Sequence, residues 1–415
     1  MTTPSSVGPL LAHYPLADEA VSEAEVSLLR LPVVESLVAG HQEESNRPES
    51  GRPHFRDLTV VRLGTRSGAS LVHGWGECAA LATAGYWPET ALGAFDLLGT
   101  IDGTLIGRTP LEILEAPPID RWRFPMAAAA LEMAVVDLVL RPAGVSLAAT
   151  IGTEIGTVPA GSTVGLAPVE VVASRVLALH QQGFGRVKVK IEPGHDLEVI
   201  EAIGQRLDSA LTSGQFSLQV DANGSYGDRD LAVLVGLAEA GVRVIEQPFA
   251  VDRWRPAERL CQALLTEGLS TLVLADEQAS TVDRALEAVA RGAAHGVVVK
   301  PGRLGGLAPT LQLLDEAAGR GVPVSIGGML ESGLGRHALA AVAAAAHQST
   351  PTVTGDLSPA RRWLADDPWP DVEVSSSAGT VHIVVPRHPG VAPLPDPDVL
   401  DRHTVDRTTI GSAGH

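Results

Sequence analysis

The pattern of apolar positions changes at about residue 158. Beyond this point, short runs rich in β-branched residues alternate with longer stretches of helical pattern, which is typical of βα units and a parallel sheet. The span from Val158 to Asp356 is short for an eight-stranded barrel, and a missing last helix would account for part of the deficit. The eight predicted strands, with seven helical segments between them, read VPAGSTVGL, RVKVKIE, SLQVDAN, VRVIEQP, LVLADEQ, GVVVKPG, VPVSIGG and TVTGDLS.

The first part of the chain has a different pattern. Residues 57–78 are predicted to form two strands joined by a turn, and helical segments follow through residues 125–140. The polar stretch 40–54 is predicted to be a mobile loop. The proline-rich tail contains one strand-like run, GTVHIVVP, and we expect it to return to the first domain. The predicted parts are an α+β domain (1–155), a barrel (156–356) and a C-terminal segment (357–415).

Composition and charge narrow the class of protein. Of the 415 residues, 45% are hydrophobic and 19% are charged, which favours a folded protein with a large core. The net charge of −18 disfavours nucleic acid and anionic membranes as partners, because both need a basic face. Two cysteines, Cys78 and Cys261, make no disulfide framework, and Cys78 is expected to be a packed thiol. With neither a secretory signal nor a membrane-spanning stretch in the sequence, we expect a cytoplasmic protein.

Four consecutive predicted strands end in polar residues that could carry chemistry. The carboxyl ends of barrel strands meet at one mouth, where such barrels place their active sites. Three carboxylates that converge there repel one another and are costly to bury unless a cation neutralises them. Oxygen ligands with open positions suit Mg²⁺, with Mn²⁺ as an expected substitute, and we predict Asp221, Glu246 and Asp276 as the ligands. The complete set at these strand ends is Asp221, Asn223, Glu246, Asp276, Glu277 and Lys300.

Lysines flank the predicted metal ligands on both sides. Lys188 and Lys190 lie two apart on the preceding strand, so their side chains point to the same side, and Lys300 ends the strand after the last ligand. Nearby positive charge and partial burial lower the pKa of a lysine, and a neutral lysine is a general base. If the metal binds a substrate carboxylate, the proton on the neighbouring carbon becomes removable, because metal and lysine charge hold the resulting enediolate. The paired lysines therefore fit one base and one charge partner.

Each of these features also has a purely structural interpretation. A K-x-K pair often marks a solvated face or a charged edge strand, a carboxylate at a strand end often caps the next helix, and Lys300 could be a salt-bridge partner. Helix caps do not predict carboxylates on three consecutive strands flanked by lysines, so the joint pattern favours a metal site. The stretch GGMLESGLGR (327–336) is either a tight turn or a place where backbone amides hold an anionic part of a ligand. The candidates in or around the substrate site are Asn223, Glu277, Gly328, Met329, Glu331 and Ser332.

The motifs K-x-K, D-A-N, E-Q-P, A-D-E, K-P-G-R-x-G-G and G-G-M-L-E-S-G follow one another in this order. In them the chain resembles the enolase superfamily, muconate-lactonizing subgroup, and within it the o-succinylbenzoate synthase and N-succinylamino acid racemase family. The resemblance covers most of the chain, since residues 74–90 and the stretch AAAALEMAVVDL resemble the family's capping domain. It implies an α+β capping domain, completed by the C-terminal tail, over a (β/α)7β TIM-like barrel. Family members are commonly homo-oligomers, but the sequence has no independent interface signal.

The resemblance also implies roles for the residues that match the motifs. Lys190 corresponds to the base that removes the proton alpha to a carboxylate, and Lys300 to the residue that stabilises the enediolate. Lys188 would assist at the carboxylate, and Asn223 would lie close to the metal. The implied ligands of one Mg²⁺ are again Asp221, Glu246 and Asp276.

The implied substrate is a small carboxylate. In the synthase, 2-succinyl-6-hydroxy-2,4-cyclohexadiene-1-carboxylate undergoes syn-dehydration to o-succinylbenzoate, a menaquinone precursor; in the racemase, Lys190 and Lys300 work on opposite faces of an N-acylamino acid. We take the synthase as the first interpretation, the racemase as the alternative, and another enzyme of the subgroup as the third. A Schiff-base aldolase would not need three carboxylates, and a barrel that only binds its ligand would not need the acid–base residues.

One region departs from the family pattern. The family has a short, aromatic-bearing loop early in the capping domain, whereas residues 31–57 here are longer and more polar. This difference leaves the substrate open but does not affect the predicted acid–base residues. Tyr86 and Trp87 are expected either to cover the mouth or to lie in the core.

Overall fold

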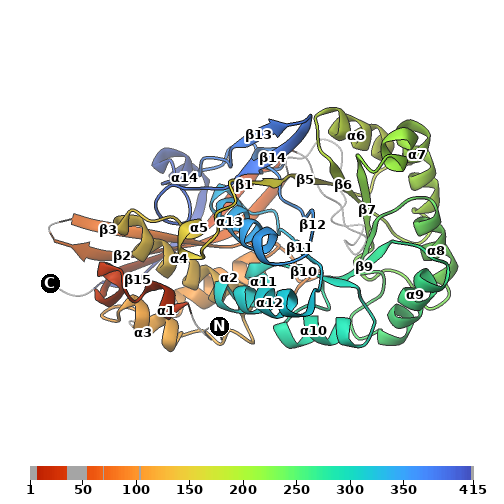
Figure 1. Ribbon diagram of the computed structural model, residues 1–415. Helices are drawn as coiled ribbons and strands as arrows, with labels where there is room; N and C mark the ends of the chain where they lie inside the picture. Colours follow the sequence, from red (N-terminus) through yellow and green to blue (C-terminus); the bar gives the residue numbers. More distant parts are fainter. Residues whose placement is uncertain (1–6, 35–53, 69, 102–103, 413–415) are drawn as a thin grey trace.

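Parallel strands and helices alternate through the middle of the chain. The computed structural model describes residues 7–34, 54–68, 70–101 and 104–412 (Figure 1). Within that part of the chain, eight parallel strands lie side by side in chain order, and the sheet curls until its edges meet, where the Gly161 amide donates to the Leu357 carbonyl at 3.1 Å. The predicted barrel is therefore confirmed. Its strands are β5 (Gly161–Val164), β6 (Arg186–Lys190), β7 (Ser217–Asp221), β8 (Val244–Glu246), β9 (Leu272–Ala275), β10 (Gly296–Val299), β11 (Val324–Ile326) and β12 (Thr352–Val353).

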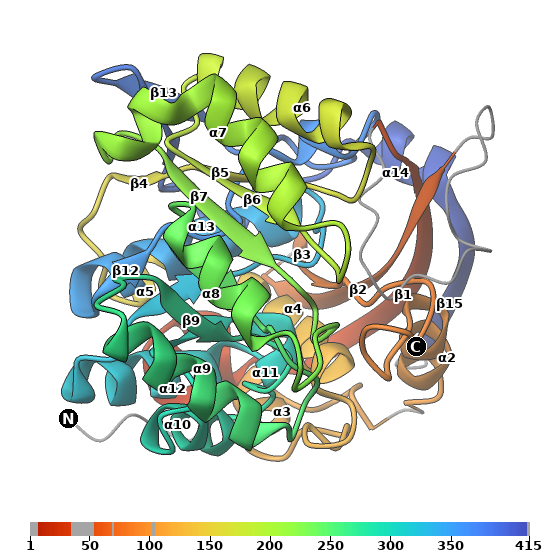
Figure 2. The same ribbon diagram turned by 90° about the vertical axis from the view of Figure 1, so that its right-hand side faces the viewer.

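Helices cover the outside of this sheet (Figure 2). The longer ones show why the sequence folds this way: in residues 197–212 the buried positions Val199, Ile200, Ile203 and Leu207 recur at helical spacing and form one apolar stripe. In the described chain, β12 leads only into a 3-10 turn, in line with the expected missing last helix. The helices are α6 (Val169–Gln181), α7 (Leu197–Thr212), α8 (Leu231–Glu239), α9 (Trp254–Thr266), α10 (Val282–Ala290), α11 (Pro301–Leu304), α12 (Leu307–Arg320) and α13 (Gly333–Ser349), and the turn is η3 (Ala360–Arg362).

An antiparallel sheet beside the barrel draws on both ends of the chain. Its described strands run in the order β15-β1-β2-β3, so the C-terminal strand pairs with the first strand. Helix α4 packs closely on β3, because Gly74 and Gly76 have no side chain to collide with its backbone at Ala130 and Ala134. The elements are α1 (Gly8–Leu11), η1 (Pro15–Asp18), β1 (Val21–Pro32), β2 (Phe55–Ser67), β3 (Ser70–Cys78), α2 (Ala91–Gly99), α3 (Pro110–Glu115), α4 (Pro125–Ala143), α5 (Leu147–Thr150), α14 (Pro397–His403) and β15 (Thr404–Ser412).

Two details differ from the prediction. The first predicted barrel strand is split into β4 (Thr157–Pro159) and β5, and β4 pairs with the tail hairpin of β13 (Val374–Ser377) and β14 (Thr380–Val384). The run GTVHIVVP therefore forms a strand, but it pairs at the start of the barrel rather than with the first sheet. Most of the predicted loop 40–54 lies outside the described residues. The division of the chain at residues 155 and 356 stays a prediction.

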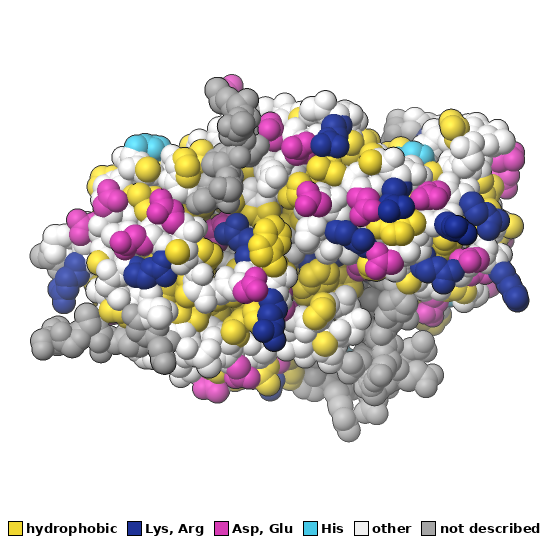
Figure 3. Space-filling view, turned by 90° about the horizontal axis from the view of Figure 1, so that it is seen from below, with side chains coloured by type: hydrophobic (Ala, Val, Ile, Leu, Met, Phe, Trp, Pro, Cys, Tyr) yellow, Lys and Arg dark blue, Asp and Glu magenta, His cyan; other side chains and the backbone are white. Residues whose placement is uncertain are grey.

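Charges of both signs share one face of the molecule. On the face shown in Figure 3, acidic and basic side chains are interspersed over the elements. Across the described residues, we find no helix whose length and apolar character would let it cross a membrane.

A buried aspartate joins three parts of the structure. Asp137, in α4, is fully buried and accepts hydrogen bonds from the amides of Trp75 in β3 (3.0 Å) and Val391 in the tail (2.7 Å). Its carboxylate also pairs with Arg141 at 2.7 Å. Burial raises the pKa of Asp137, and the Arg141 guanidinium opposes that shift. This carboxylate thus ties the first sheet, its helix and the C-terminal segment together.

We expect Asp137→Ala to lower the free energy of unfolding by about 3 kcal/mol or more, because it leaves two buried amides and a guanidinium without their acceptor. Chemical denaturation monitored by circular dichroism measures the change. Asp96→Asn, at an exposed position of α2, should change stability by less than about 0.5 kcal/mol. Equal effects of the two substitutions would contradict this account.

Candidate active site

The carboxyl ends of adjacent barrel strands bring the predicted residues into one layer. Lys190, Asp221 and Glu246 are the last residues of β6, β7 and β8, and the parallel register pairs Lys190 with Asp221 and Asp221 with Glu246. Asp276 and Lys300 directly follow β9 and β10. Side chains from five consecutive strands therefore meet at one mouth of the barrel.

Lys188 is the central cation of this cluster. Its Nζ lies 2.7 Å from Glu246, 3.1 Å from Asp221 and 2.6 Å from Asp356, and only 2% of its side chain is exposed. Burial acts to lower the pKa of Lys188, but the carboxylates of Asp356 and Glu246 raise it well above the usual value. Lys188 is thus held as an ammonium, which suits the charge partner of the predicted lysine pair.

Lys190 lies nearer to the mouth. Its Nζ binds Asp221 Oδ2 and Asn223 Oδ1, both at 2.6 Å, and its side chain is more exposed than that of Lys188, at 13%. The Asn223 amide group in turn donates to Glu277 at 2.9 Å. The structure thus brings Asn223 and Glu277 into the site together with the second lysine of the pair.

Lys300 reaches the site from the far side of the barrel. Strands β6 and β10 are four positions apart in the eight-stranded order, so Lys190 and Lys300 approach from opposite sides. The Lys300 ammonium binds Asp276 at 2.8 Å and the Tyr86 hydroxyl at 2.7 Å. Tyr86 comes from the loop after β3, so the first part of the chain covers this side of the mouth. Trp87 lies beside it, with the Arg303 guanidinium 5.5 Å from its ring centre.

Two site residues escaped the sequence reasoning. Asp356 follows β12, binds Lys188, and also accepts hydrogen bonds from Thr163 and Arg186. It ends the last predicted strand in the same way as the acids of the other strands, and this position was the signal that could have revealed it. Arg303, in the K-P-G-R motif, is fully buried and pairs with Asp276 at 2.6 Å. A lone arginine after a strand has no comparable signal.

The G-G-M-L-E-S-G stretch forms the turn from β11 to α13. The amide of Met329 donates to Glu331 at 2.6 Å, and the amide of Ser332 donates to Glu77 in β3 at 3.1 Å. Ser332 also caps α13 through its hydroxyl. These two amides bind carboxylates of the protein itself, which favours the structural interpretation of the turn over an anion site. Gly328, preceding Met329, lies in the same turn.

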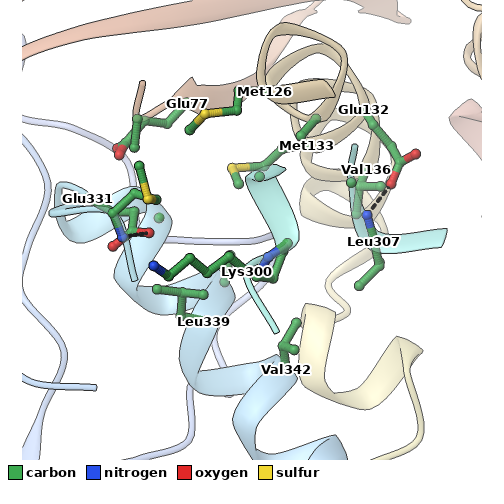
Figure 4. Close-up of a pocket in the computed structure, with 18 of the residues that line it drawn as sticks. Glu77, Met126, Glu132, Met133, Val136, Lys300, Leu307, Glu331, Leu339 and Val342 are labelled. Atoms are coloured by element: carbon green, nitrogen blue, oxygen red, sulfur yellow. Dashed lines mark hydrogen bonds between the residues drawn. The ribbon is translucent and has the colours of Figure 1, made fainter. Parts of the chain in front are cut away.

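An apolar cavity of about 70 Å³ lies beside Lys300, between α4 and α13. Figure 4 shows the lysine stem along one wall, with Met126 and Met133 of α4 opposite. Glu77 and Glu331 lie at one end of this cavity. The Lys300 stem is therefore packed among apolar groups while its ammonium points into the polar cluster.

The pKa values of the buried carboxyl groups at the mouth are shifted in different directions. Burial acts to raise the pKa of Asp221 and of Asp276, but cationic partners, Lys190 for the first and Arg303 for the second, bring both below the usual value. Burial and repulsion from Asp221 raise the pKa of Glu246 to about 8, and burial and repulsion from Asp276 raise that of Glu277 to about 7. Glu246 and Glu277 are thus inclined to retain protons near neutral pH, mainly because they are buried, and an added cation beside them would favour their charged form.

Known proteins with similar sequences identify the family to which this barrel and its site belong. Residues 171–399 match the family described as enolase C-terminal domain-like. The chain belongs to the enolase superfamily. It is 33% identical to an N-succinylamino acid racemase of an Amycolatopsis species over 370 residues, which is 88% of this chain and 95% of that protein. It is 32% identical to the o-succinylbenzoate synthase of Bacillus subtilis over 84% of this chain and 89% of that one. Within the superfamily it therefore falls in the family of these synthases and racemases.

Solved structures show the same fold. An enolase-superfamily member from Listeria innocua superimposes with a TM-score of 0.76 at 27% identity, covering 94% of this chain and 99% of that one. The barrel with its neighbouring antiparallel sheet is thus the architecture of this superfamily.

The donor set fits the divalent cation predicted from the sequence. Among the residues that the structure describes, no three acidic, histidine or cysteine side chains stand together as a metal site, and Lys188 bridges Asp221 and Glu246. The carboxylates of Asp221, Glu246 and Asp276 are nevertheless buried at adjacent strand ends and offer only oxygen ligands, which suits Mg²⁺. Their role as ligands stays a prediction.

Mg²⁺ should raise the melting temperature of the wild-type protein. At a free concentration of about 100 times its Kd, a ligand that binds only the folded state adds about 2.7 kcal/mol. We expect an increase of a few degrees in scanning calorimetry, reversed by EDTA and lost in Asp221→Asn. Asp228→Asn, at a half-exposed surface position, should keep the increase. A shift that survives Asp221→Asn unchanged would contradict the predicted ligand.

Proposed function

We propose that the protein is a Mg²⁺-dependent o-succinylbenzoate synthase. One observation carries the acid–base part of this proposal. The sequence contains 28 arginines but only three lysines, Lys188, Lys190 and Lys300, and all three lie in the cluster at the mouth of the barrel. Arginine cannot lose its proton in a protein, whereas lysine can. All lysines of the chain thus lie at the site where the reaction would need a basic side chain that can exchange a proton.

In the proposed reaction, Lys190 is the general base that removes the proton alpha to the substrate carboxylate. Lys300, on the opposite side of the barrel, contributes positive charge to the enediolate that forms. Protonated Lys190 remains on the face from which the hydroxyl group leaves, and its proton completes the water that is lost. The Lys188 ammonium, fixed by three carboxylates, stabilises the substrate carboxylate.

Asp221, Glu246 and Asp276 would hold the metal ion. Bound there, Mg²⁺ supplies positive charge to the substrate carboxylate and so acidifies the neighbouring carbon. The protein's own part is to place Lys190 beside that carbon and to keep the ammonium of Lys188 charged. The proposal also includes a small carboxylate as the substrate and a cytoplasmic location.

A racemase is the second candidate, because Lys190 and Lys300 stand on opposite sides of the mouth. With two lysines so placed, one can remove a proton from an N-succinylamino acid while the other delivers one to the opposite face. The Amycolatopsis relative carries this activity in its name, and the Bacillus subtilis relative carries the synthase activity. Both reactions would start with the same proton abstraction.

Turnover of the cyclohexadiene substrate tests the synthase directly. We expect a Mg²⁺-dependent absorbance change with kcat/KM above about 10⁴ M⁻¹s⁻¹. Lys190→Ala should lower kcat by about 10²–10⁴-fold, because it removes the general base. The control Arg320→Ala, at an exposed position of α12, should retain the wild-type rate. The absence of turnover in the wild type would refute the synthase assignment.

Proton exchange in deuterated water tests the racemase. The wild type should incorporate solvent deuterium into both enantiomers of an N-succinylamino acid, as followed by ¹H NMR. Lys190→Ala should lose exchange into one enantiomer and Lys300→Ala into the other, since each lysine serves one face. Loss of exchange into the same enantiomer in both variants would contradict opposite placement.

A further inference from the structure

Arg56, near the start of β2, is a buried cation that the reaction does not use. It is 5% exposed. All five guanidinium N–H groups find backbone carbonyls: Nη1 donates to Asp57 (2.9 Å) and Ala80 (2.6 Å), and Nη2 donates to Ala79. The other two bonds cross to the barrel, where Nη2 donates to Met329 (2.9 Å) and Nε to Leu330 (3.2 Å). One side chain therefore binds the ends of two strands of the first sheet to the turn after β11.

That turn is held in an unfavourable backbone conformation. Leu330 has φ +61°, in the left-handed region that a bulky residue rarely adopts. Such a conformation persists only where the surroundings impose it. Arg56 binds the carbonyls on both sides of the Leu330 amide, while Glu77 binds Ser332 and so fixes the end of the turn. Both of these residues belong to the antiparallel sheet.

The same turn lies against the Lys300 side chain. A Cβ at Gly327 would come within 2.9 Å of Lys300 Cε and 3.1 Å of its Cγ, so the bare backbone of this glycine packs on the lysine stem. The Gly327 amide also donates to the Val299 carbonyl, immediately before Lys300, at 2.9 Å. A displacement of the turn would therefore press on the lysine stem or leave it unsupported.

We propose that Arg56 is a positioning residue that places Lys300 for its part in the reaction by holding the turn of residues 327–332, with Leu330 in its left-handed conformation. The inference rests on the proposed role of Lys300, but it concerns a residue of the antiparallel sheet that never touches the substrate. Arginine keeps its proton in a protein, so the buried guanidinium binds the carbonyls as a cation, even though burial lowers the pKa of Arg56 against the opposing effect of Glu77 and Glu331. Arg56 thereby couples the antiparallel sheet to the barrel at the site.

The small number of lysines makes a test without substrate possible. Lysine labelled with ¹³C at Cε gives one NMR signal for each of Lys188, Lys190 and Lys300, which Lys→Arg variants assign. In Arg56→Gln, we expect the Lys300 signal to shift or broaden, with the other two signals unchanged. Amide hydrogen exchange at Met329 and Ser332, measured by mass spectrometry, should quicken at least about ten-fold. The matched control is Arg30→Gln, an exposed arginine on β1 that pairs with Asp57.

Steady-state kinetics and a second, rescuing substitution distinguish a positioning role of Arg56 from a general effect on stability. In Arg56→Gln we expect kcat to fall at least about ten-fold with KM changed less than about three-fold, because an interaction that matters in the transition state is lost. Adding Leu330→Gly should restore part of kcat, since glycine adopts the left-handed conformation without penalty. Adding Leu330→Ala shortens the side chain but keeps the penalty, and should restore nothing. If Arg56→Gln does not fold, Arg56→Lys keeps the charge and serves in its place, and its own added lysine signal is identified as the one that the wild type lacks.

Three results would overturn the proposal. The first is a lower melting temperature with the Lys300 signal and kcat unchanged, and the second is an equal shift of all three lysine signals. The third is equal rescue by Leu330→Gly and Leu330→Ala. The NMR and exchange measurements need no turnover, so a wild type inactive on both substrates would refute the proposed function while the coupling of Arg56 to Lys300 is still decided.

Discussion

The mutual neutralisation of buried carboxylates and lysines is the constraint on which the site depends. Asp221, Glu246 and Asp276 lie at adjacent strand ends with almost no exposed surface, and each would be costly to bury as an isolated charge. Lys188, between Glu246 and Asp356, offsets part of that cost and is itself kept charged. The parallel order of the strands makes this arrangement possible, because it delivers one charged side chain after another to a single mouth.

Contacts between the barrel and the first sheet shape this cluster from outside. Tyr86 touches Lys300 and Asp276, and Arg56 holds the turn that packs on the lysine stem. Glu132 of α4 also connects the first sheet's helix to the barrel, because it accepts a hydrogen bond from the Ala308 amide at the start of α12. In the alanine-rich helix α4, Glu132 thus serves the contact with the barrel, while Asp137 serves the contacts with β3 and the C-terminal segment.

The sequence predicted the barrel well because its signal is local. Each strand is a short apolar run bounded by helices, and strand ends converge by topology, so Lys190, Asp221 and Glu246 could be placed together from the order of the residues alone. The break between β4 and β5 could not, since Ala160 looks like any other residue of the run. Its cause is the pairing of β4 with β14, more than two hundred residues away. The strand β1 was missed as well; it lies between β2 and β15, and β15 comes from the other end of the chain.

Contacts across long separations in sequence limited the prediction of the site as well. The link between Arg56 and Leu330 joins positions 274 residues apart, and a single arginine near the start of a strand has no pattern of its own.

The burial of the barrel lysines has a consequence for proteolytic digestion. Side chains of Lys188, Lys190 and Lys300 are 2%, 13% and 7% exposed, so a protease that cuts after lysine finds no accessible bond in the folded chain. Cleavage by such an enzyme would report the opening of the barrel itself, and not the fraying of any surface loop.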